Sequence, residues 1–423
     1  MNLMQSQSTI LYKALQKRYS RKINLDLKRI KAALLKLKQP HLELKNPINV
    51  LGSDGKMSVL TSLKYFLESK NDKVTAFTSP HLYDVRHRFW LKDKYISINK
   101  IKKFIKIVEK TKSKLTLFEL LTCVYILAAR EQKNISYNLI ESGLLFKKDS
   151  TNLWKYPRAQ IVTNINFQHS EWVNPKTLSE ICKQKIGYIS QKSIIYIGKQ
   201  KPKTLRIIKK ILKKNSSKII YPSSWKIEKR GAKYFFKDSS IIIPIKSKKI
   251  LSRGLMDNLG LAIKVALDFG VKKNNIIKTI PKINFEGRVQ YINKGKLTKL
   301  IRKDDKLLID GCHSETSAEN LNNYLRTLNK PIYGIWGMQK NKMPEKFIKK
   351  FKNTFKKIIT VNIPNEINAL NASKLKEICL KNKYKSETAA NIIEALKKCS
   401  DSESKTIVVF GSLYLIGSVL KIN

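Results

Sequence analysis

The chain has 423 residues, 42% of them hydrophobic, which exceeds what one hydrophobic core usually serves, so two domains are expected. Lys and Arg outnumber Asp and Glu by 85 to 31, a formal charge of +54, yet the lysines are spread along the whole chain rather than gathered in one stripe. This favours compositional bias over a polyanion-binding surface, so no specific nucleic-acid partner is expected.

Cysteine spacing and apolar patterning exclude two further classes of protein. The five cysteines are scattered, odd in number and without metal-ligand spacing, which excludes a disulfide framework and indicates a reducing compartment. No apolar segment approaches the roughly 20 residues that are needed to cross a bilayer. We therefore expect a soluble, cytoplasmic protein with no membrane partner.

Strand-like and helix-like apolar segments alternate along the first part of the chain. Amphipathic helices are predicted around residues 10–15 and 23–30. Predicted strands follow at residues 48–51, 74–77, 137–140, 159–165 and 194–197, and predicted helices at 60–67, 101–108, 118–129, 178–185, 204–212, 256–269 and 274–279. This alternation predicts an α/β domain with a mainly parallel sheet.

The pattern changes after residue 218 and restarts after residue 285. Residues 218–244 are rich in aromatic and turn residues, which predicts an antiparallel insertion at the edge of the sheet. Further strands are predicted at residues 307–309, 332–336, 357–361 and 406–410. We place the domain boundary near Phe285, with one domain of residues 1–284 that includes short N-terminal helices and a smaller α/β domain of residues 285–423.

The most informative local motif lies between the first strand and its helix. It reads Gly52-Ser53-Asp54-Gly55-Lys56-Met57-Ser58. The backbone N–H groups of such a loop can hold a phosphate, the lysine supplies a charge, and the hydroxyl can reach a magnesium ion. The strict form has Ser or Thr directly after the lysine and a Gly five residues before Gly55, where this chain has Met57 and Val50. Taken alone, an ordinary glycine-containing turn explains the loop equally well.

Polar residues stand where several predicted strands end. Ser79 and Glu141 follow two of these strands, and His169 follows the strand at 159–165. Ligands of parallel sheets bind beyond the carboxyl ends of strands, which favours a functional interpretation. Each residue also has an ordinary one: Glu141 as a helix cap, His169 as a hydrogen-bonded structural histidine, and Ser79 as part of a turn.

The joint order of these motifs resembles the folylpolyglutamate synthase and dihydrofolate synthase family, in its bifunctional bacterial type, a branch of the Mur ligase superfamily. The likeness covers nearly the whole chain, and Ser79-Pro80-His81-Leu82 is its piece most specific to the folate branch. The other motifs that carry it are Ile23 to Ile30, Glu141-Ser142-Gly143-Leu144, Asp149-Ser150-Thr151-Asn152, Asn166-Phe167-Gln168-His169, Lys183 to Gly187, Asn258, Glu286-Gly287-Arg288, Asp310-Gly311-Cys312-His313 and Val409 to Ser412.

The resemblance implies a P-loop-type Mur ligase central domain followed by a Rossmann-like domain, in a monomer. It also implies an ADP-forming ligase that joins L-glutamate to dihydropteroate or reduced folates through an acyl phosphate, with ATP and Mg²⁺. Lys56 matches the lysine against the β and γ phosphates. Ser79, Glu141 and His169 match the magnesium ligands, and Lys185 matches a lysine that the family uses in carbamylated form.

The remaining site residues also come from the resemblance. Asn258, Arg288, Asp310 and His313 match nucleotide contacts, together with the phosphate loop from Gly52 to Ser58; Asp310 read alone could equally be a helix N-cap. Residues that correspond to the pterin-binding regions are Thr116, Phe118, Glu119, Lys148, Asp149 and Ser150.

Several positions depart from the family pattern. Met57 stands where a Gly normally lets the backbone close round the phosphate. The other departures are Leu145-Phe146-Lys147 for Gly-Gly-Arg, Gln168 for Asp, and Ser314-Glu315 for Asn-Pro. A working synthase is therefore expected, with two alternatives: a diverged, weakly active or non-catalytic nucleotide-binding protein, and a nucleic-acid-binding protein.

Overall fold

The computed structural model describes residues 6–19, 24–231, 233–399 and 403–423, so Ile23 of the predicted N-terminal pattern lies outside the described residues. The chain divides into two compact units, one of Met1–Ser247 with Asp257–Ile283 and one of Lys248–Met256 with Asn284–Asn423. The chain passes from the first unit to the second between Ile283 and Asn284, beside Phe285. The second unit also takes in Lys248–Met256, which the sequence pattern assigns to the first domain.

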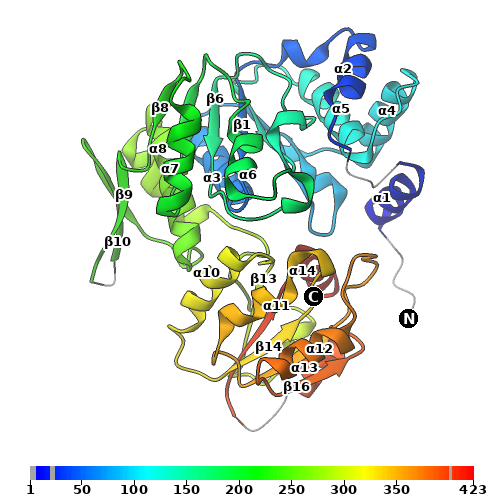
Figure 1. The fold of residues 1–423 in the computed structure, drawn as a ribbon, viewed down its shortest axis with the longest axis vertical. Helices are drawn as coiled ribbons and strands as arrows, with labels where there is room; N and C mark the ends of the chain where they lie inside the picture. The colour runs from blue at the N-terminus through cyan, green and yellow to red at the C-terminus, as the bar shows by residue number, and fades with distance from the viewer. Residues whose placement is uncertain (1–5, 20–23, 232, 400–402) are drawn as a thin grey trace. The chain divides into compact units, whose positions relative to one another are not determined.

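A mainly parallel sheet with strand order β4-β3-β2-β5-β1-β6-β7-β8 forms the centre of the first unit (Figure 1). The strands from β2 to β8 in this order run parallel, whereas β3 pairs antiparallel with β2 and β4 at one edge. Each residue of β1 is buried, because a central parallel strand is covered on both faces. The strands are β1 (Pro47–Leu51), β2 (Val74–Phe77), β3 (Phe89–Lys92), β4 (Lys94–Tyr95), β5 (Tyr137–Glu141), β6 (Ala159–Val162), β7 (Ile194–Ile197) and β8 (Lys218–Ile220).

Helices whose apolar faces follow the helical period cover this sheet. In α4 the residues Ile98, Ile101, Phe104, Ile105 and Val108 are buried, which is the stripe that the sequence predicts. Figure 1 shows α6 and α7 side by side, and they enclose a core with β1, β6 and β7. The helices are α1 (Gln7–Arg18), α2 (Leu27–Lys36), α3 (Lys56–Glu68), α4 (Ile98–Glu109), α5 (Leu117–Arg130), α6 (Leu178–Ile186), α7 (Pro202–Leu212), α8 (Arg253–Asp268) and α9 (Lys273–Thr279).

The predicted antiparallel insertion is smaller than residues 218–244. Strands β9 (Trp225–Arg230), β10 (Lys233–Asp238) and β11 (Ile242–Ile245) form a separate antiparallel sheet, as expected. The first part of the segment, β8, instead pairs parallel with β7 in the main sheet. The strand predicted at 159–165 is likewise shorter, because the chain leaves the sheet after Val162.

The second unit has its own sheet, with strand order β12-β13-β17-β14-β15-β16. All neighbours in it are parallel except β12, which runs antiparallel to β13. Its elements are β12 (Gln290–Ile292), β13 (Lys306–Asp310), α10 (Glu315–Leu325), β14 (Ile332–Trp336), α11 (Pro344–Ile348), β15 (Lys357–Val361), α12 (Ala372–Lys381), β16 (Ser386–Ala389), α13 (Ile392–Lys398), β17 (Thr406–Phe410) and α14 (Leu413–Ile422).

Across the part of the chain that the structure describes, no helix combines the length and apolarity needed to span a membrane.

Candidate active site

The strand order of the first sheet brings the predicted site segments to one edge. The strands β2, β5, β1 and β6 are consecutive and parallel, so their carboxyl ends lie along the same edge. Ser79 lies two residues beyond β2, Glu141 ends β5, the phosphate loop follows β1, and the segment that carries His169 follows β6. This is the edge at which parallel sheets bind ligands.

The two glycines of the phosphate loop are required by their surroundings. Gly52 has a φ of 142°, and a Cβ atom there would lie 2.1 Å from the Thr163 hydroxyl. Gly55 has a φ of 91°, and a Cβ atom there would lie 2.5 Å from Nδ2 of Asn258. Asn258, which the resemblance assigns to nucleotide contact, therefore lies directly against the phosphate loop.

Helix α3 begins at Lys56 with an N-terminus suited to an anion. Gly55 at the N-cap has no side chain, so no side-chain cap occupies the first N–H groups of α3. The Lys56 ammonium group folds back toward the carbonyl oxygens of Gly52 and Ser53, at 3.4 and 3.3 Å. Met57 occupies the second helical position and is half-buried. The loop thus combines free amides with a cation, which is the chemistry that a polyphosphate needs.

Two of the predicted metal ligands are in contact. The Ser79 N–H donates to Oε2 of Glu141 at 3.0 Å, and Glu141 is 3% exposed. His169 is half-buried with a φ of 62°, and its Nδ1 lies 4.0 Å from Oε1 of Glu171. No group of three His, Cys, Asp or Glu side chains close enough to hold a metal ion is found in the described residues. The predicted set of one carboxylate, one hydroxyl and one imidazole fits a hard cation that takes its other ligands from phosphate and water.

The segment after β6 is bound to the phosphate loop through backbone and side chains. The N–H groups of Ser53 and Asp54 donate to the Asn164 carbonyl oxygen, at 2.8 and 3.2 Å. The Asn166 N–H donates to the Ser53 hydroxyl at 3.2 Å. Oδ2 of Asp54 accepts from Nδ2 of Asn166 at 2.7 Å and from Nε2 of Gln168 at 3.0 Å. The sequence motif contained Asn166 but gave it no role, although its position between the strand end and His169 was a usable signal.

Lys185 is a buried lysine at this site. Its Nζ atom donates to the carbonyl oxygens of Gly52 at 2.9 Å and Leu144 at 2.6 Å, and the side chain is 2% exposed. Burial and, second to it, the nearby Lys56 charge lower the pKa of Lys185 to about 7, against the opposing pull of Asp149 and Asp54. An amine with such a pKa is about half neutral at pH 7, and its neutral form is nucleophilic.

Two of the residues predicted to bind the pterin have structural partners. Thr116 and Glu119 form a capping box at the start of α5. The Glu119 carboxylate also accepts from Nε and Nη2 of Arg29, at 3.1 and 2.8 Å. This ion pair joins α2 to α5, and the sequence analysis did not anticipate it because the two residues are 90 positions apart.

The other predicted pterin residues surround the segment after Glu141. The ring of Phe118 stacks on Phe77 with 5.8 Å between centroids. Asp149 is buried, and its carboxylate accepts from the Leu144 N–H at 3.1 Å, while burial raises its pKa. The Ser150 hydroxyl lies 2.9 Å from that of Thr122 in α5, and Lys148 is exposed. Asp149 and Ser150 thus hold the loop in shape, while Lys148 is accessible.

The predicted nucleotide residues of the second unit lie together at the carboxyl end of β13. The Asp310 carboxylate accepts from the N–H groups of Val289 at 2.8 Å and Cys312 at 2.7 Å. Burial raises the pKa of Asp310, against the opposing effect of the Arg288 charge and these amides. Nδ1 of His313 lies 2.9 Å from the carbonyl oxygen two residues before it. Asp310 therefore ties the segment that carries Arg288 to the loop that carries His313.

The departures from the family pattern have partners in the fold. Leu145 and Phe146 are 2% and 1% exposed and belong to the core beneath α6 and α7. The Lys147 ammonium group lies over the Tyr188 ring, 4.4 Å from its centroid. The flexible glycine pair of the family is thus replaced here by two apolar anchors.

In the second unit the departures at 314 and 315 are also accommodated. Ser314 forms a capping box with Ser317 at the start of α10. Glu315 pairs with Lys350 at 3.2 Å, so the added carboxylate is balanced by a cation.

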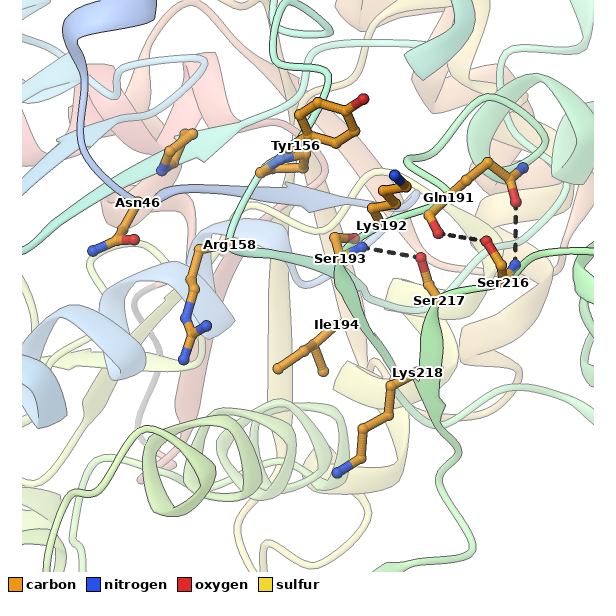
Figure 2. Close-up of a pocket in the computed structure, with 12 residues that line it drawn as sticks. Asn46, Tyr156, Arg158, Gln191, Lys192, Ser193, Ile194, Ser216, Ser217 and Lys218 are labelled. Atoms are coloured by element: carbon orange, nitrogen blue, oxygen red, sulfur yellow. Dashed lines mark hydrogen bonds between the residues drawn. The ribbon is translucent and has the colours of Figure 1, made fainter.

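A separate hollow of about 680 Å³ lies at the opposite edge of the first sheet. It is lined by Pro47, Arg158, Ser193 and Lys218, which begin or directly precede β1, β6, β7 and β8. Figure 2 shows hydrogen bonds across its wall, including that from the Ser193 N–H to the Ser217 hydroxyl at 3.1 Å. Because it lies at the amino ends of the strands, this hollow is distinct from the candidate active site.

Two α/β units, with a phosphate loop at the carboxyl edge of the first unit's parallel sheet, give the chain a Mur-ligase-like fold. Residues 293–422 match the family model described as the C-terminal domain of dihydrofolate synthetase. The chain is 26% identical to the dihydrofolate synthetase of Saccharomyces cerevisiae over 95% of this chain and 98% of the relative. It is 23% identical to the dihydrofolate synthase/folylpolyglutamate synthase of Bacillus subtilis, over 93% and 94%.

A solved structure extends the likeness to the fold. The bifunctional folylpolyglutamate synthase/dihydrofolate synthase of Yersinia pestis, complexed with AMPPNP and Mn ion, superposes with a TM-score of 0.83 at 17% identity and covers 98% of each chain. The chain is thus similar, along nearly its whole length, to folylpolyglutamate synthases and dihydrofolate synthases.

Proposed function

We propose that the chain is an ATP-dependent ligase that adds L-glutamate to dihydropteroate, to reduced folates, or to both, and that releases ADP and phosphate. The observation that carries this proposal is the edge formed by β2, β5, β1 and β6, where the uncapped N-terminus of α3 and Lys56 lie with Glu141 and Lys185. The names of the yeast and Bacillus relatives support the reaction class.

The phosphate loop would hold the nucleotide triphosphate. Free N–H groups at the start of α3 face the phosphate oxygens, and the Lys56 ammonium group offsets the charge that develops during phosphoryl transfer. Asn258 adds a polar side chain beside Gly55. The first unit is thus the ATP-binding domain of this proposal, and the contacts predicted for Arg288, Asp310 and His313 stay predictions.

Magnesium fits the donor set of the site. Ser79, Glu141 and His169 would hold it, and when bound it would supply positive charge beside the transferred phosphoryl group. The Yersinia structure, complexed with AMPPNP and Mn ion, supports a divalent cation at this kind of site. The Glu141 carboxylate, already oriented by the Ser79 N–H, needs little rearrangement for that role.

Two chemical steps follow from this assignment. The carboxylate of the pteroate or folate attacks the γ-phosphorus of ATP, which gives an acyl phosphate and ADP. The amino group of glutamate then attacks the acyl carbon, the C–O bond to phosphate breaks, and the amine loses a proton. Both steps build charge on phosphoryl oxygens, so the chain acts mainly by positioning and by charge compensation from Lys56.

Lys185 has a separate role in the proposal. Its neutral amine would form an N–C bond to carbon dioxide and lose a proton to the solvent, which gives a carbamate and so replaces a cation by a carboxylate-like group at the base of the phosphate loop. The low pKa and the contact with the Gly52 carbonyl oxygen support this role. We also infer a monomer in the cytoplasm, which light scattering of the purified protein and fractionation of cells would test.

Phosphate release by the purified protein tests the function. Release should require ATP, magnesium, glutamate and either dihydropteroate or tetrahydrofolate together. Glu141→Gln should abolish metal-dependent turnover without unfolding the protein, because it removes the charge but keeps the shape. Glu68→Gln is the matched control, since Glu68 accepts a hydrogen bond from Nε1 of Trp90 at 2.8 Å near the far end of α3. Absence of release with both pteroate substrates, or full activity of Glu141→Gln, would contradict the proposal.

A further inference from the structure

We propose that Asp54 and Gln168 are a matched pair of positioning residues that hold the phosphate loop against the segment carrying His169. The nucleotide-binding role of that loop, which this inference uses, rests on the proposed function. Gln168 stands where the family carries an aspartate, and the structure shows what this exchange accomplishes.

Asp54 and Gln168 are joined both directly and through Asn166. Oδ2 of Asp54 accepts from Nε2 of Gln168 at 3.0 Å and from Nδ2 of Asn166 at 2.7 Å. Nε2 of Gln168 also donates to Oδ1 of Asn166 at 2.7 Å. One carboxylate oxygen in the phosphate loop thus receives two amide donors from the neighbouring segment.

The chemistry of these groups makes the pair specific. A carboxylate offers only acceptors, whereas the Gln168 amide supplies N–H donors. Gln168 is 8% exposed, so water does not readily replace a lost partner. A second carboxylate at position 168 would place like charges face to face in a buried setting, which is strongly unfavourable. Gln168 therefore complements Asp54, and an aspartate or glutamate at 168 is incompatible with it.

The place of the pair in the chain gives it a mechanical role. Asp54 lies between Gly52 and Lys56, while Gln168 directly precedes His169. The contact therefore sets the separation between the phosphate-binding amides and a predicted magnesium ligand. Backbone hydrogen bonds from Ser53 and Asp54 to Asn164 align the two segments, and the side-chain pair secures their far end.

A double-mutant cycle tests the pair. The variants are Gln168→Glu, which is isosteric, Asp54→Asn, which removes the opposing charge, and the two combined. The matched control is Gln184→Glu, since Gln184 donates to the Glu180 carboxylate at 2.6 Å along the surface of α6. Thermal unfolding of the ligand-free protein, the dissociation constant of ADP with magnesium, and the KM values for ATP and glutamate are measured for each.

Gln168→Glu should lower the Tm of the ligand-free protein by about 5 °C at neutral pH, weaken ADP binding about tenfold and raise the KM for ATP, with the KM for glutamate unchanged. The combined variant should recover most of each loss, because an amide again faces a carboxylate. Gln184→Glu should change little, since surface charges are screened.

Additive losses in the combined variant, or a Gln168→Glu effect no larger than that of Gln184→Glu, would overturn the pairing. The unfolding cycle needs neither substrate nor metal, so it stands apart from the proposed function. Coupling in unfolding without any ligase activity would support the pair while contradicting the function, and activity without coupling would do the reverse.

Discussion

Lys185 should make the activity depend on dissolved carbon dioxide. A neutral amine attacks carbon dioxide and forms a carbamate, whereas an ammonium group cannot. Burial, together with the Lys56 charge, lowers the pKa of Lys185 to about 7, and its Nζ atom is fixed by the carbonyl oxygens of Gly52 and Leu144. The perturbation to apply is therefore the removal of carbon dioxide, or of the amine by Lys185→Met.

The magnitude follows from the pKa. An ordinary lysine with a pKa of about 10.4 is only about 0.1% neutral at pH 7.5, whereas a pKa of about 7 gives about three quarters neutral, an increase of about six hundredfold. The shift corresponds to about 5 kcal/mol against the charged form. Because the folded-state pKa is depressed, the neutral fraction rises with pH through about 7, from about one tenth at pH 6 to about nine tenths at pH 8.

The assay is phosphate release at a fixed carbon dioxide pressure and in buffer freed of carbon dioxide. Activity should fall at least about tenfold on removal, recover when bicarbonate is returned, and rise between pH 6 and 8 at constant carbon dioxide pressure, since removing one well-placed active-site group commonly costs about a hundredfold. Protein exposed to ¹³C-labelled carbon dioxide should show a carbamate resonance that Lys185→Met lacks. Lys183→Met is the control, because Lys183 is exposed on the same helix.

Two results would refute this reasoning. One is undiminished turnover after thorough removal of carbon dioxide. The other is a carbamate resonance that persists in Lys185→Met, which would place the modification elsewhere.

Three further predictions concern the site and its support. Gly55→Ala should weaken ADP binding at least about tenfold, because Gly55 has a φ of 91° and its added Cβ atom would lie 2.5 Å from the Asn258 side chain. Gly270→Ala is the control, since Gly270 has a φ of 79° but open space around it, and it should leave ADP binding intact. Equal ADP affinity of the two variants in calorimetry would contradict this prediction. Arg29→Ala should lower the free energy of unfolding by about 3 to 5 kcal/mol in urea titrations, because it leaves the Glu119 carboxylate buried without its cation. A loss below about 1 kcal/mol would show that the ion pair contributes little to stability. Phe146→Ala should destabilise the protein by about 3 to 5 kcal/mol in the same titrations, since the ring is 1% exposed in the core, and a neutral effect would mean that this departure is no anchor.

Local pattern in the sequence was sufficient for much of the fold. The strands at 74–77 and 194–197 and the helix at 178–185 match β2, β7 and α6 closely, because buried elements carry continuous or periodic apolar residues that can be read without tertiary information. The short edge strands β3 and β4 were missed, since they are brief and partly exposed and so lack a strong pattern.

The candidate active site, too, could be predicted only where its residues lie close together in the sequence. Gly52, Gly55 and Lys56 could be predicted from spacing, because a phosphate loop is a local structure whose turn, amides and charge lie within a few residues. The family resemblance identified four further candidate site residues, Ser79, Glu141, His169 and Lys185. It could not show which of their side chains are in contact.

The sequence by itself thus determined most of the long buried elements, the place of the phosphate loop and the family resemblance. The tertiary structure alone decided that β2, β5, β1 and β6 are neighbours, that Lys185 is buried with a depressed pKa, and that Asp54 faces Gln168. The reason is that strand order, burial and side-chain partners depend on contacts between residues far apart in the chain, such as Asp54 and Gln168, which are 114 positions apart. Local periodicity does not reveal such contacts. The contacts determine which groups are buried and which charges lie near them, and these in turn determine chemical reactivity.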